Sequence, residues 1–335
     1  VPAYQSVRRQ ALGSLIPPST SVAENRFVLP DADINLQAVA VIPEDGFEPK
    51  HLDDNALRGR PTSGYSPALT VGDFVFVPGI IAMARHDEPG RNGLAAAAVI
   101  PEGFQWAGQP IKLETEFIIN QRIEPSLALA DAGLGDIVKV QAYLTNPDDY
   151  SAFNEVWARY FGETGPALSV IPCKHRGLAV SDGRIEINVL AVKTKGTTKR
   201  QHIDAGVIAG FRHQPQAVKA GDLLFLSGLM AIDEEGLVPG AVSDARQPWF
   251  ASSAEVQAEF IIDNAERLCE AAGTSIANVV RVQQFHTDIG EFYPVYKVWE
   301  RRLGGAPLPF TAVEVPSPLP MPGATILMDI WVYAP

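Results

Sequence analysis

An internal duplication constrains the fold of this chain more than any other feature. VGDFVFVPG (71–79) and AGDLLFLSG (220–228) share a Gly-Asp turn followed by an apolar strand pattern. Further on, DIVKVQAYLTN (136–146) matches NVVRVQQFHTD (278–288), and an amphipathic helix pattern with one tryptophan follows in both copies. Agreement of so many segments in the same order predicts two structural repeats.

The start of the chain resembles only the last part of such a repeat. Residues 3–13 match the late helix, 17–24 the strand after it, and 34–41 the closing strand. Because half a repeat cannot bury its own apolar face, we expect it to pack on another unit. The expected organisation is the C-terminal part of a first repeat (1–45), a linker (46–62), a second repeat (63–194), a linker (195–209) and a third repeat (210–335).

Composition limits the class of protein. The 335 residues are 46% hydrophobic and carry a net charge of −12, which is typical of a globular protein and argues against nucleic acid or an anionic membrane as partner. No apolar run approaches the length of a membrane span. Cys173 and Cys269 lie in different repeats and form no disulfide framework, so a reduced, cytoplasmic location is expected.

The repeated order of strand, Gly-Asp turn, strand, helix, strand, helix and two strands resembles the Rid/YjgF family. Residues 216–233 look like its opening signature and residues 281–299 like its middle. The resemblance implies an α+β fold of chorismate-mutase-like units, each a mixed β-sheet with two helices on one face. Three units would assemble as a trimer-like barrel with ligand clefts between neighbours. It also implies hydrolysis of reactive enamines or imines to a carbonyl compound and ammonia, with no cofactor.

The resemblance implies that the substrate is bound by an arginine in the sequence pattern P-x-R-[ST], because a guanidinium is suited to binding a carboxylate. The matching positions here are Ser19, Leu168 and Phe310, so the arginine is absent. Leu168 and Phe310 predict a more apolar cleft and a larger or aromatic substrate, with packed residues in a degenerate cleft as the alternative interpretation. Lys174, His175 and Arg176 offer another way to hold an anion, although a solvated loop is the simpler interpretation.

The resemblance also implies a carboxylate on the closing strand, where it assists water or moves a proton. The counterparts are Gln37, Asn188 and Asp329, and only Asp329 is an acid. Its neighbours Met328 and Ile330 are apolar, so we expect a raised pKa and a role in acid–base catalysis. The alternative interpretation is that Asp329 only forms a hydrogen bond to a loop. Asn188 is expected to bind substrate through hydrogen bonds.

Other positions match cleft residues of the family. The Gly228 amide is a candidate oxyanion donor, with a strand-end turn as the alternative interpretation. The remaining candidates for substrate binding are Tyr65, His213, Gln214, Ser227 and His286. None of the histidines has the spacing of a known metal motif, so no metal site is expected.

We therefore predict a hydrolase that acts on an activated C–N bond of a small, apolar or aromatic molecule in a cleft between repeats. One alternative is a catalytically degenerate protein that binds small molecules or serves assembly. Another is a different hydrolase on a multi-repeat scaffold of similar shape. The expected partners are a small-molecule substrate and either further copies of this chain or the missing N-terminal part of the first repeat.

Overall fold

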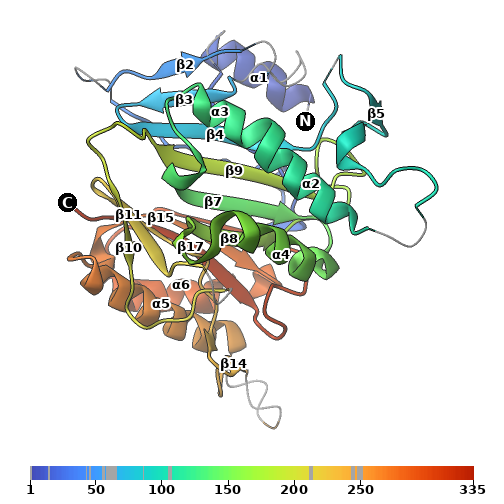
Figure 1. Ribbon diagram of the computed structural model, residues 1–335. Coiled ribbons are helices and arrows are strands. Elements are labelled where there is room, and N and C mark those ends of the chain that lie inside the picture. The colour runs from blue at the N-terminus through green and yellow to red at the C-terminus, as the bar shows by residue number, and fades with distance from the viewer. Residues whose placement is uncertain are drawn as a thin grey trace.

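The computed structural model describes residues 2–13, 16–42, 44, 47–54, 57, 66–85, 87–104, 108–210, 214–242, 246 and 252–335. Two mixed β-sheets occupy its centre, and each carries helices on its outer face (Figure 1). One sheet is built mainly from the second repeat and the other mainly from the third. This arrangement confirms an α+β fold of tandem units.

The sheet of the second repeat has the strand order β2-β3-β4-β9-β7-β8. Among the strands described in this sheet, only β7 and β8 pair in parallel. A short β-hairpin follows β4. The strands are β2 (Lys50–Leu52), β3 (Ala68–Val71), β4 (Phe74–Ile81), the hairpin strands β5 (Gly90–Arg91) and β6 (Leu94–Ala95), β7 (Ile137–Leu144), β8 (Ala167–Pro172) and β9 (Ile185–Val192).

The sheet of the third repeat has the order β1-β16-β15-β17-β12-β11-β10 and repeats the same topology, with β15 and β16 as its parallel pair. Its strands are β1 (Arg26–Phe27), β10 (Arg200–Ile203), β11 (Ala217–Ala220), β12 (Leu223–Leu226), the hairpin strands β13 (Ile232–Asp233) and β14 (Gly236–Leu237), β15 (Val279–His286), β16 (Phe310–Glu314) and β17 (Ile326–Tyr333). The Gly-Asp turns join β3 to β4 and β11 to β12. Gly72 and Gly221 both have φ 55°, which glycine adopts without strain.

The helices cover the outer sheet faces through their apolar sides, as the periodicity predicts. In the second repeat the first helix is interrupted by a π-helical turn just before Pro125, which has no N–H to continue the ladder. The equivalent tryptophans Trp157 and Trp299 are each 1% exposed. The helices are α2 (Pro110–Ile118), the π turn (Ile119–Ile123), α3 (Glu124–Ala128), α4 (Tyr150–Phe161), α5 (Ser253–Ala271) and α6 (Phe292–Arg302).

The inner faces of the two sheets pack on each other. One buried cluster joins Tyr143 and Ile171 of the second repeat to Phe285 and Leu327 of the third. The junction between the repeats is therefore a contact of sheet face with sheet face, and burial of these side chains stabilises the pairing of the two units.

The N-terminal segment packs along both repeats instead of forming a unit of its own. The predicted late helix is present as α1 (Pro2–Leu12), and β1 extends the third repeat's sheet by pairing with β16. The predicted closing strand at 34–41 is wrong, because no described backbone pairs beside it. Its apolar side chains Ile34 and Leu36 are exposed.

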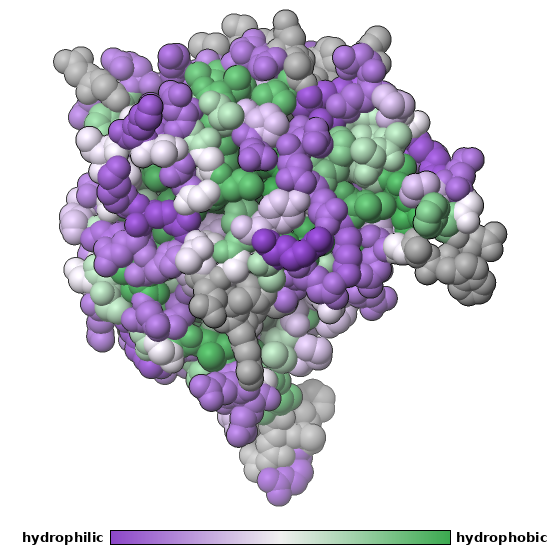
Figure 2. All heavy atoms as spheres, in the orientation of Figure 1, coloured by the Kyte–Doolittle hydropathy of each residue, from purple (hydrophilic) through white to green (hydrophobic). Residues whose placement is uncertain are grey.

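Polar side chains cover most of the face shown in Figure 2, with separate apolar patches between them. No helix in the described ranges combines the length and the apolar character that a membrane crossing requires. The expected homo-oligomer, and the cytoplasmic location, stay predictions.

Candidate functional site

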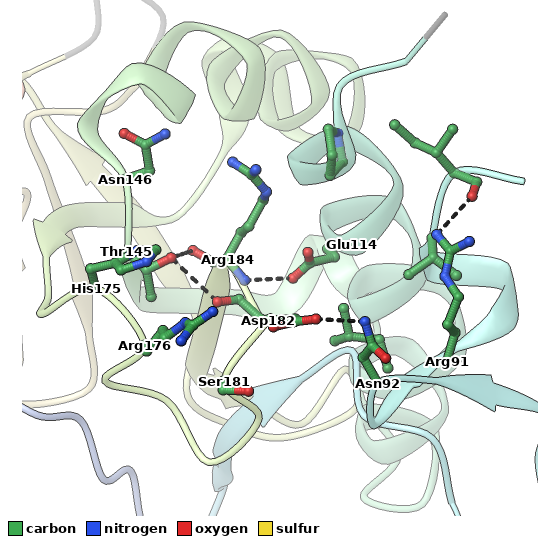
Figure 3. A pocket seen from close by; sticks show the side chains of 15 residues that line it. Arg91, Asn92, Glu114, Thr145, Asn146, His175, Arg176, Ser181, Asp182 and Arg184 are labelled. Carbon is green, nitrogen blue, oxygen red and sulfur yellow. Dashed lines mark hydrogen bonds between the residues drawn. The ribbon is translucent and has the colours of Figure 1, made fainter. Parts of the chain in front are cut away.

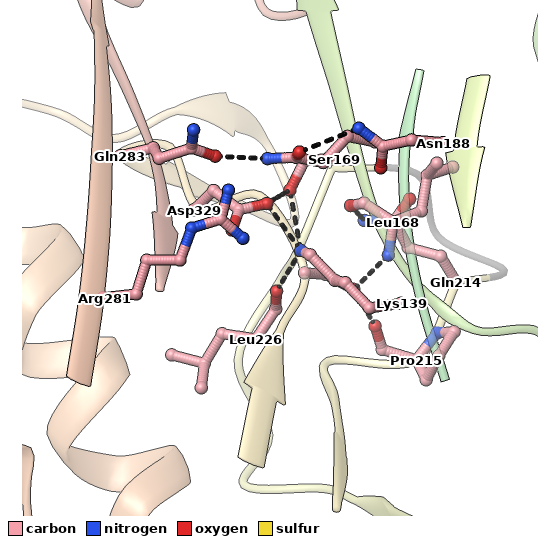
Figure 4. Close-up of polar contacts among 12 residues, drawn as sticks. Lys139, Leu168, Ser169, Asn188, Gln214, Pro215, Leu226, Arg281, Gln283 and Asp329 are labelled. Carbon is pink, nitrogen blue, oxygen red and sulfur yellow. Dashed lines mark hydrogen bonds and ion pairs between the residues drawn. The ribbon is translucent and has the colours of Figure 1, made fainter. Parts of the chain in front are cut away.

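The junction between the second and third repeats brings together several of the predicted cleft positions (Figure 4). The Gly228 amide donates to the Leu168 carbonyl at 2.9 Å, and the Leu168 amide donates to Ser227 Oγ at 3.1 Å. Gln214 Nε2 donates to the same Leu168 carbonyl at 3.4 Å. We call this junction the inner seam; it comprises Lys139, Leu168, Ser169, Ser227, Gly228 and Asp329.

Asp329 sits at the centre of the inner seam and is fully buried. Its Oδ2 lies 2.7 Å from Lys139 Nζ and accepts a hydrogen bond from Ser169 Oγ at 2.6 Å. Lys139 Nζ also donates to the Leu226 carbonyl at 2.6 Å. The pair thus joins β7 of the second repeat to β17 of the third.

The expectation of a raised pKa for Asp329 is wrong. Burial alone would raise that pKa, but the nearby cations Lys139 and Arg281 outweigh burial and lower it. Asp329 therefore stays ionised. Its geometry is that of a structural ion pair, and the Gly228 amide, already bonded to Leu168, is not a free oxyanion donor.

The apolar side chains expected to line the clefts point elsewhere. Leu168 is 1% exposed and packs in the helix-facing core of the second repeat, so only its backbone faces the inner seam. Phe310 stacks on Phe292 of α6, with ring centroids 5.3 Å apart. Its register partner Val282 also faces the helices, and strand alternation places Phe310 on that face. The prediction of an apolar cleft wall is therefore wrong.

The same pattern recurs between the N-terminal segment and the second repeat. The Gly79 amide donates to the Ser19 carbonyl at 3.2 Å, as Gly228 does to Leu168. Asn188 Nδ2 donates to Thr20 Oγ1 at 3.0 Å. Unlike their inner-seam counterparts, Ser19, Thr20 and Asn188 are partly exposed. We call this junction the N-terminal seam; it comprises Arg8, Ser19, Thr20, Gly79, Glu186 and Asn188.

An arginine reaches the N-terminal seam from helix α1. Arg8 Nη1 donates to Ser19 Oγ at 2.6 Å, and its guanidinium lies 5.4 Å from the centre of the Tyr4 ring. Ser19 occupies the position where the Rid/YjgF resemblance places the carboxylate-binding arginine. A guanidinium thus stands beside that position although the sequence has serine there.

Glu186 supplies an acid to the same seam. It lies two residues before Asn188 on the same face of β9 and packs so closely on Gly79 that a Cβ there would lie 2.0 Å from Glu186 Oε1. Burial raises the pKa of Glu186 to about 8, opposed only in part by a hydrogen bond from the Ser21 backbone. The carboxyl group is therefore largely neutral at pH 7 and is able to donate a proton.

His286 lies outside both seams. Its side chain is fully buried beside Phe292, and Nε2 lies 3.3 Å from Gln284 Oε1. Burial lowers the pKa of His286 to about 4. Tyr65 and His213 lie outside the described residues.

The buried His286 makes stability fall in acid. The folded state takes up the imidazole proton only near pH 4, whereas the unfolded chain takes it up near 6.5, so the free energy of unfolding drops between these values by up to roughly 3 kcal/mol. His286→Leu, which copies Leu144 of the second repeat, is expected to remove this part of the pH dependence. Urea unfolding of both proteins at pH 7 and pH 4.5 measures it, and parallel losses in both would contradict the assignment.

Sequence reasoning missed Lys139, Arg8 and Glu186. Lys139 is a charged residue inside an apolar strand pattern, and Arg281 matches it in the other copy. A cation repeated at a strand position that is otherwise apolar could have indicated a buried ion pair. Glu186 lies two residues before Asn188 in the closing strand, and strand alternation predicts that both side chains share one face of the sheet. Nothing in the sequence links Arg8 to Ser19, since their contact depends on how α1 packs.

Among the residues that the structure describes, no group of three or more His, Cys, Asp and Glu side chains is placed to hold a metal ion. The chemistry available in the N-terminal seam is that of a guanidinium, a neutral carboxyl group, an amide and a hydroxyl. These groups are suited to hold an anion and to move a proton.

Comparisons with known proteins agree with this architecture. The family model described as Endoribonuclease L-PSP matches residues 108–193 and 208–334. A RutC family protein of Pyrococcus abyssi is 32% identical over 134 residues, covering 40% of this chain and 90% of the relative. The 3-aminoacrylate deaminase RutC of Acinetobacter baylyi is 29% identical over 131 residues, covering 39% of this chain and 88% of the relative.

Among solved structures, yeast Mmf1 has 24% sequence identity and a TM-score of 0.35, and the match covers 44% of this chain and all of that one. The two curated relatives match about two fifths of this chain, close to the length of one repeat, and the family model matches twice. The chain therefore belongs to the Endoribonuclease L-PSP family, which includes the Rid and RutC proteins, and carries the family's unit in tandem.

Proposed function

We propose that the chain is a deaminase-type hydrolase that releases ammonia from a small enamine or imine bearing a carboxylate, and that it does so in the N-terminal seam. The observation that carries the proposal is the Arg8 guanidinium at Ser19, where the family resemblance implies an arginine. A guanidinium binds a carboxylate through two parallel hydrogen bonds. The relative named 3-aminoacrylate deaminase RutC supports the same substrate class.

The residues of the seam fit the steps of such a hydrolysis. For an imine, water adds to the carbon, the nitrogen gains protons, the C–N bond breaks, and ammonia leaves as the oxygen becomes the carbonyl. Glu186, neutral below about pH 8, donates a proton to the nitrogen and recovers one from the attacking water. For an enamine the first proton goes to carbon. Asn188 and Thr20 hold the water or the substrate through hydrogen bonds.

Ammonia release from freshly generated substrates tests the proposal. The panel pairs 3-aminoacrylate and small amino-acid-derived imines with neutral analogues that lack the carboxylate. We expect release above the buffer rate for the carboxylate-bearing members and much slower release for the neutral ones. If every compound of the panel released ammonia no faster than it does in buffer without the protein, the proposal would be overturned.

A second candidate is a protein that binds a small molecule without turnover. The buried Lys139–Asp329 pair favours it, because it fills the inner seam where the resemblance places a cleft. A panel member that raises the melting temperature while no ammonia appears would favour this candidate.

A further inference from the structure

The second repeat contains a cavity that lies apart from both seams. Its volume is about 370 Å³, within the range of small-molecule sites. The wall comes from the β5–β6 hairpin, helix α2, the turn after β7 and the loop before β9 (Figure 3). The acidic and basic side chains that line it are Arg91, Glu114, His175, Arg176, Asp182 and Arg184.

Glu114 is the deep acid of this cavity. It is 1% exposed, and its Oε2 accepts a hydrogen bond from the Arg184 amide at 2.8 Å. The Arg184 guanidinium does not neutralise it through a direct ion pair, because its Nη1 binds Asp149 at 2.8 Å. Burial accordingly raises the pKa of Glu114 to about 7.

The third repeat shows what a purely structural residue does at this position. Gln257 stands in place of Glu114, and its Oε1 accepts from the Thr325 amide at 2.8 Å, as Glu114 does from Arg184. Gln257 Nε2 donates to the carbonyls of Ala241 and Gly323. Both the oxygen and the nitrogen of the Gln257 side-chain amide thus form hydrogen bonds within the fold. In the second repeat an acid replaces it and lines a cavity, although burying a carboxyl group costs stability.

The exposed lining of the cavity carries the cations Arg91 and Arg176, the carboxylate Asp182 and the imidazole of His175. His175 and Arg176 belong to the loop after β8, and their side chains are exposed. Within the described residues no hydrogen bond or ion pair is found for either side chain. Arg176 has φ 58°, a left-handed conformation uncommon for a non-glycine residue, in a turn closed by the bond from the Gly177 amide to the Lys174 carbonyl at 2.7 Å. That turn places the Arg176 guanidinium and the His175 imidazole at the rim, with no described hydrogen-bond or ion-pair partner for either.

We propose that this cavity is a second ligand site and that it binds a free amino acid or a similar small zwitterion. The anionic group of the ligand contacts Arg176 and His175 at the rim, and its ammonium group binds Glu114 in the interior. The exposed lining carries Arg91, Arg176 and Asp182, and the interior holds Glu114, so the cavity offers partners for both charges of this ligand. The proposal does not depend on the proposed deaminase activity.

Isothermal titration calorimetry of the full chain with L-alanine, L-leucine and L-glutamine tests the site. Propionate and ethylamine, which carry one of the two charges each, serve as comparison ligands. We expect saturable binding of at least one of the amino acids and at least about tenfold weaker binding of both single-charge compounds. Absence of binding by all three amino acids, or equal binding of propionate or ethylamine, would overturn the proposal.

Variants locate the binding. Glu114→Gln copies the residue of the third repeat and is expected to fold, while Arg176→Ala removes a rim cation. Each is expected to weaken amino-acid binding at least about tenfold. Lys174→Ala is the matched control, since it removes a cation of the same loop that does not line the cavity. Unchanged affinity in both cavity variants, or an equal loss in Lys174→Ala, would contradict the assignment.

Discussion

Replacing Lys139 with alanine is expected to lower the free energy of unfolding by about 3–5 kcal/mol. The change leaves the Asp329 carboxylate fully buried between the two sheets without the ammonium group now 2.7 Å away. It also removes the hydrogen bond to the Leu226 carbonyl. Urea unfolding at pH 7 measures the loss, and Lys297→Ala, at an exposed ion pair on α6, provides a control that should change little.

The double variant Lys139→Met with Asp329→Leu separates the ion pair from packing. With both charges of the pair removed and apolar side chains of similar size in their place, part of the lost stability is expected to return. The recovery is incomplete because the buried Arg281 guanidinium loses the nearby Asp329 carboxylate. A single-variant cost below about 1 kcal/mol would mean that the pair does not hold the repeats together. A double variant as unstable as Lys139→Ala would show that volume, not charge, decides the effect.

Replacing Arg8 with alanine is expected to reduce kcat/KM for carboxylate-bearing imines about 100-fold, mainly through a higher KM. Under the proposed function the guanidinium binds the substrate in both the ground state and the transition state, so its loss is expected to weaken binding more than it slows the chemical step. Initial rates of ammonia release over a range of substrate concentrations measure the effect.

Two further variants define the role of this arginine. Arg8→Lys keeps the charge but loses the paired hydrogen bonds, so an intermediate loss is expected. Arg9→Ala removes the neighbouring cation of α1 and is expected to leave kcat/KM nearly unchanged. An Arg8→Ala variant with unaltered KM would show that the carboxylate is held by another group.

The sequence was sufficient for the repeats because their elements follow from local patterns. The Gly-Asp turns and the helices carrying Trp157 and Trp299 are all present as predicted. The prediction of apolar cleft walls failed because a position within a strand does not by itself show which face of the sheet the side chain occupies. Leu168 and Phe310 occupy the expected register, but strand alternation turns both toward the helices.

The candidate site was harder to predict because its chemistry is assembled between units. The pKa of Asp329 is set by Lys139 of another repeat and by Arg281 of a neighbouring strand, which no inspection of Met328 and Ile330 reveals. Arg8 likewise joins the N-terminal seam through the packing of α1. The strand predicted at 34–41 does not form for a related reason. A strand needs backbone of a neighbouring segment to pair with, and the local sequence pattern does not show whether such a partner is present.

We propose that ammonia is released in the N-terminal seam and not in the inner seam. Ammonia release from 3-aminoacrylate should be compared in Glu186→Gln and in the Lys139→Met, Asp329→Leu double variant, with folding of each verified by urea unfolding. Glu186→Gln is expected to lose activity at least about 100-fold, because the proton donor is gone, while the double variant keeps most of it. Full activity in Glu186→Gln together with loss in the folded double variant would contradict the account and return the active cleft to Asp329.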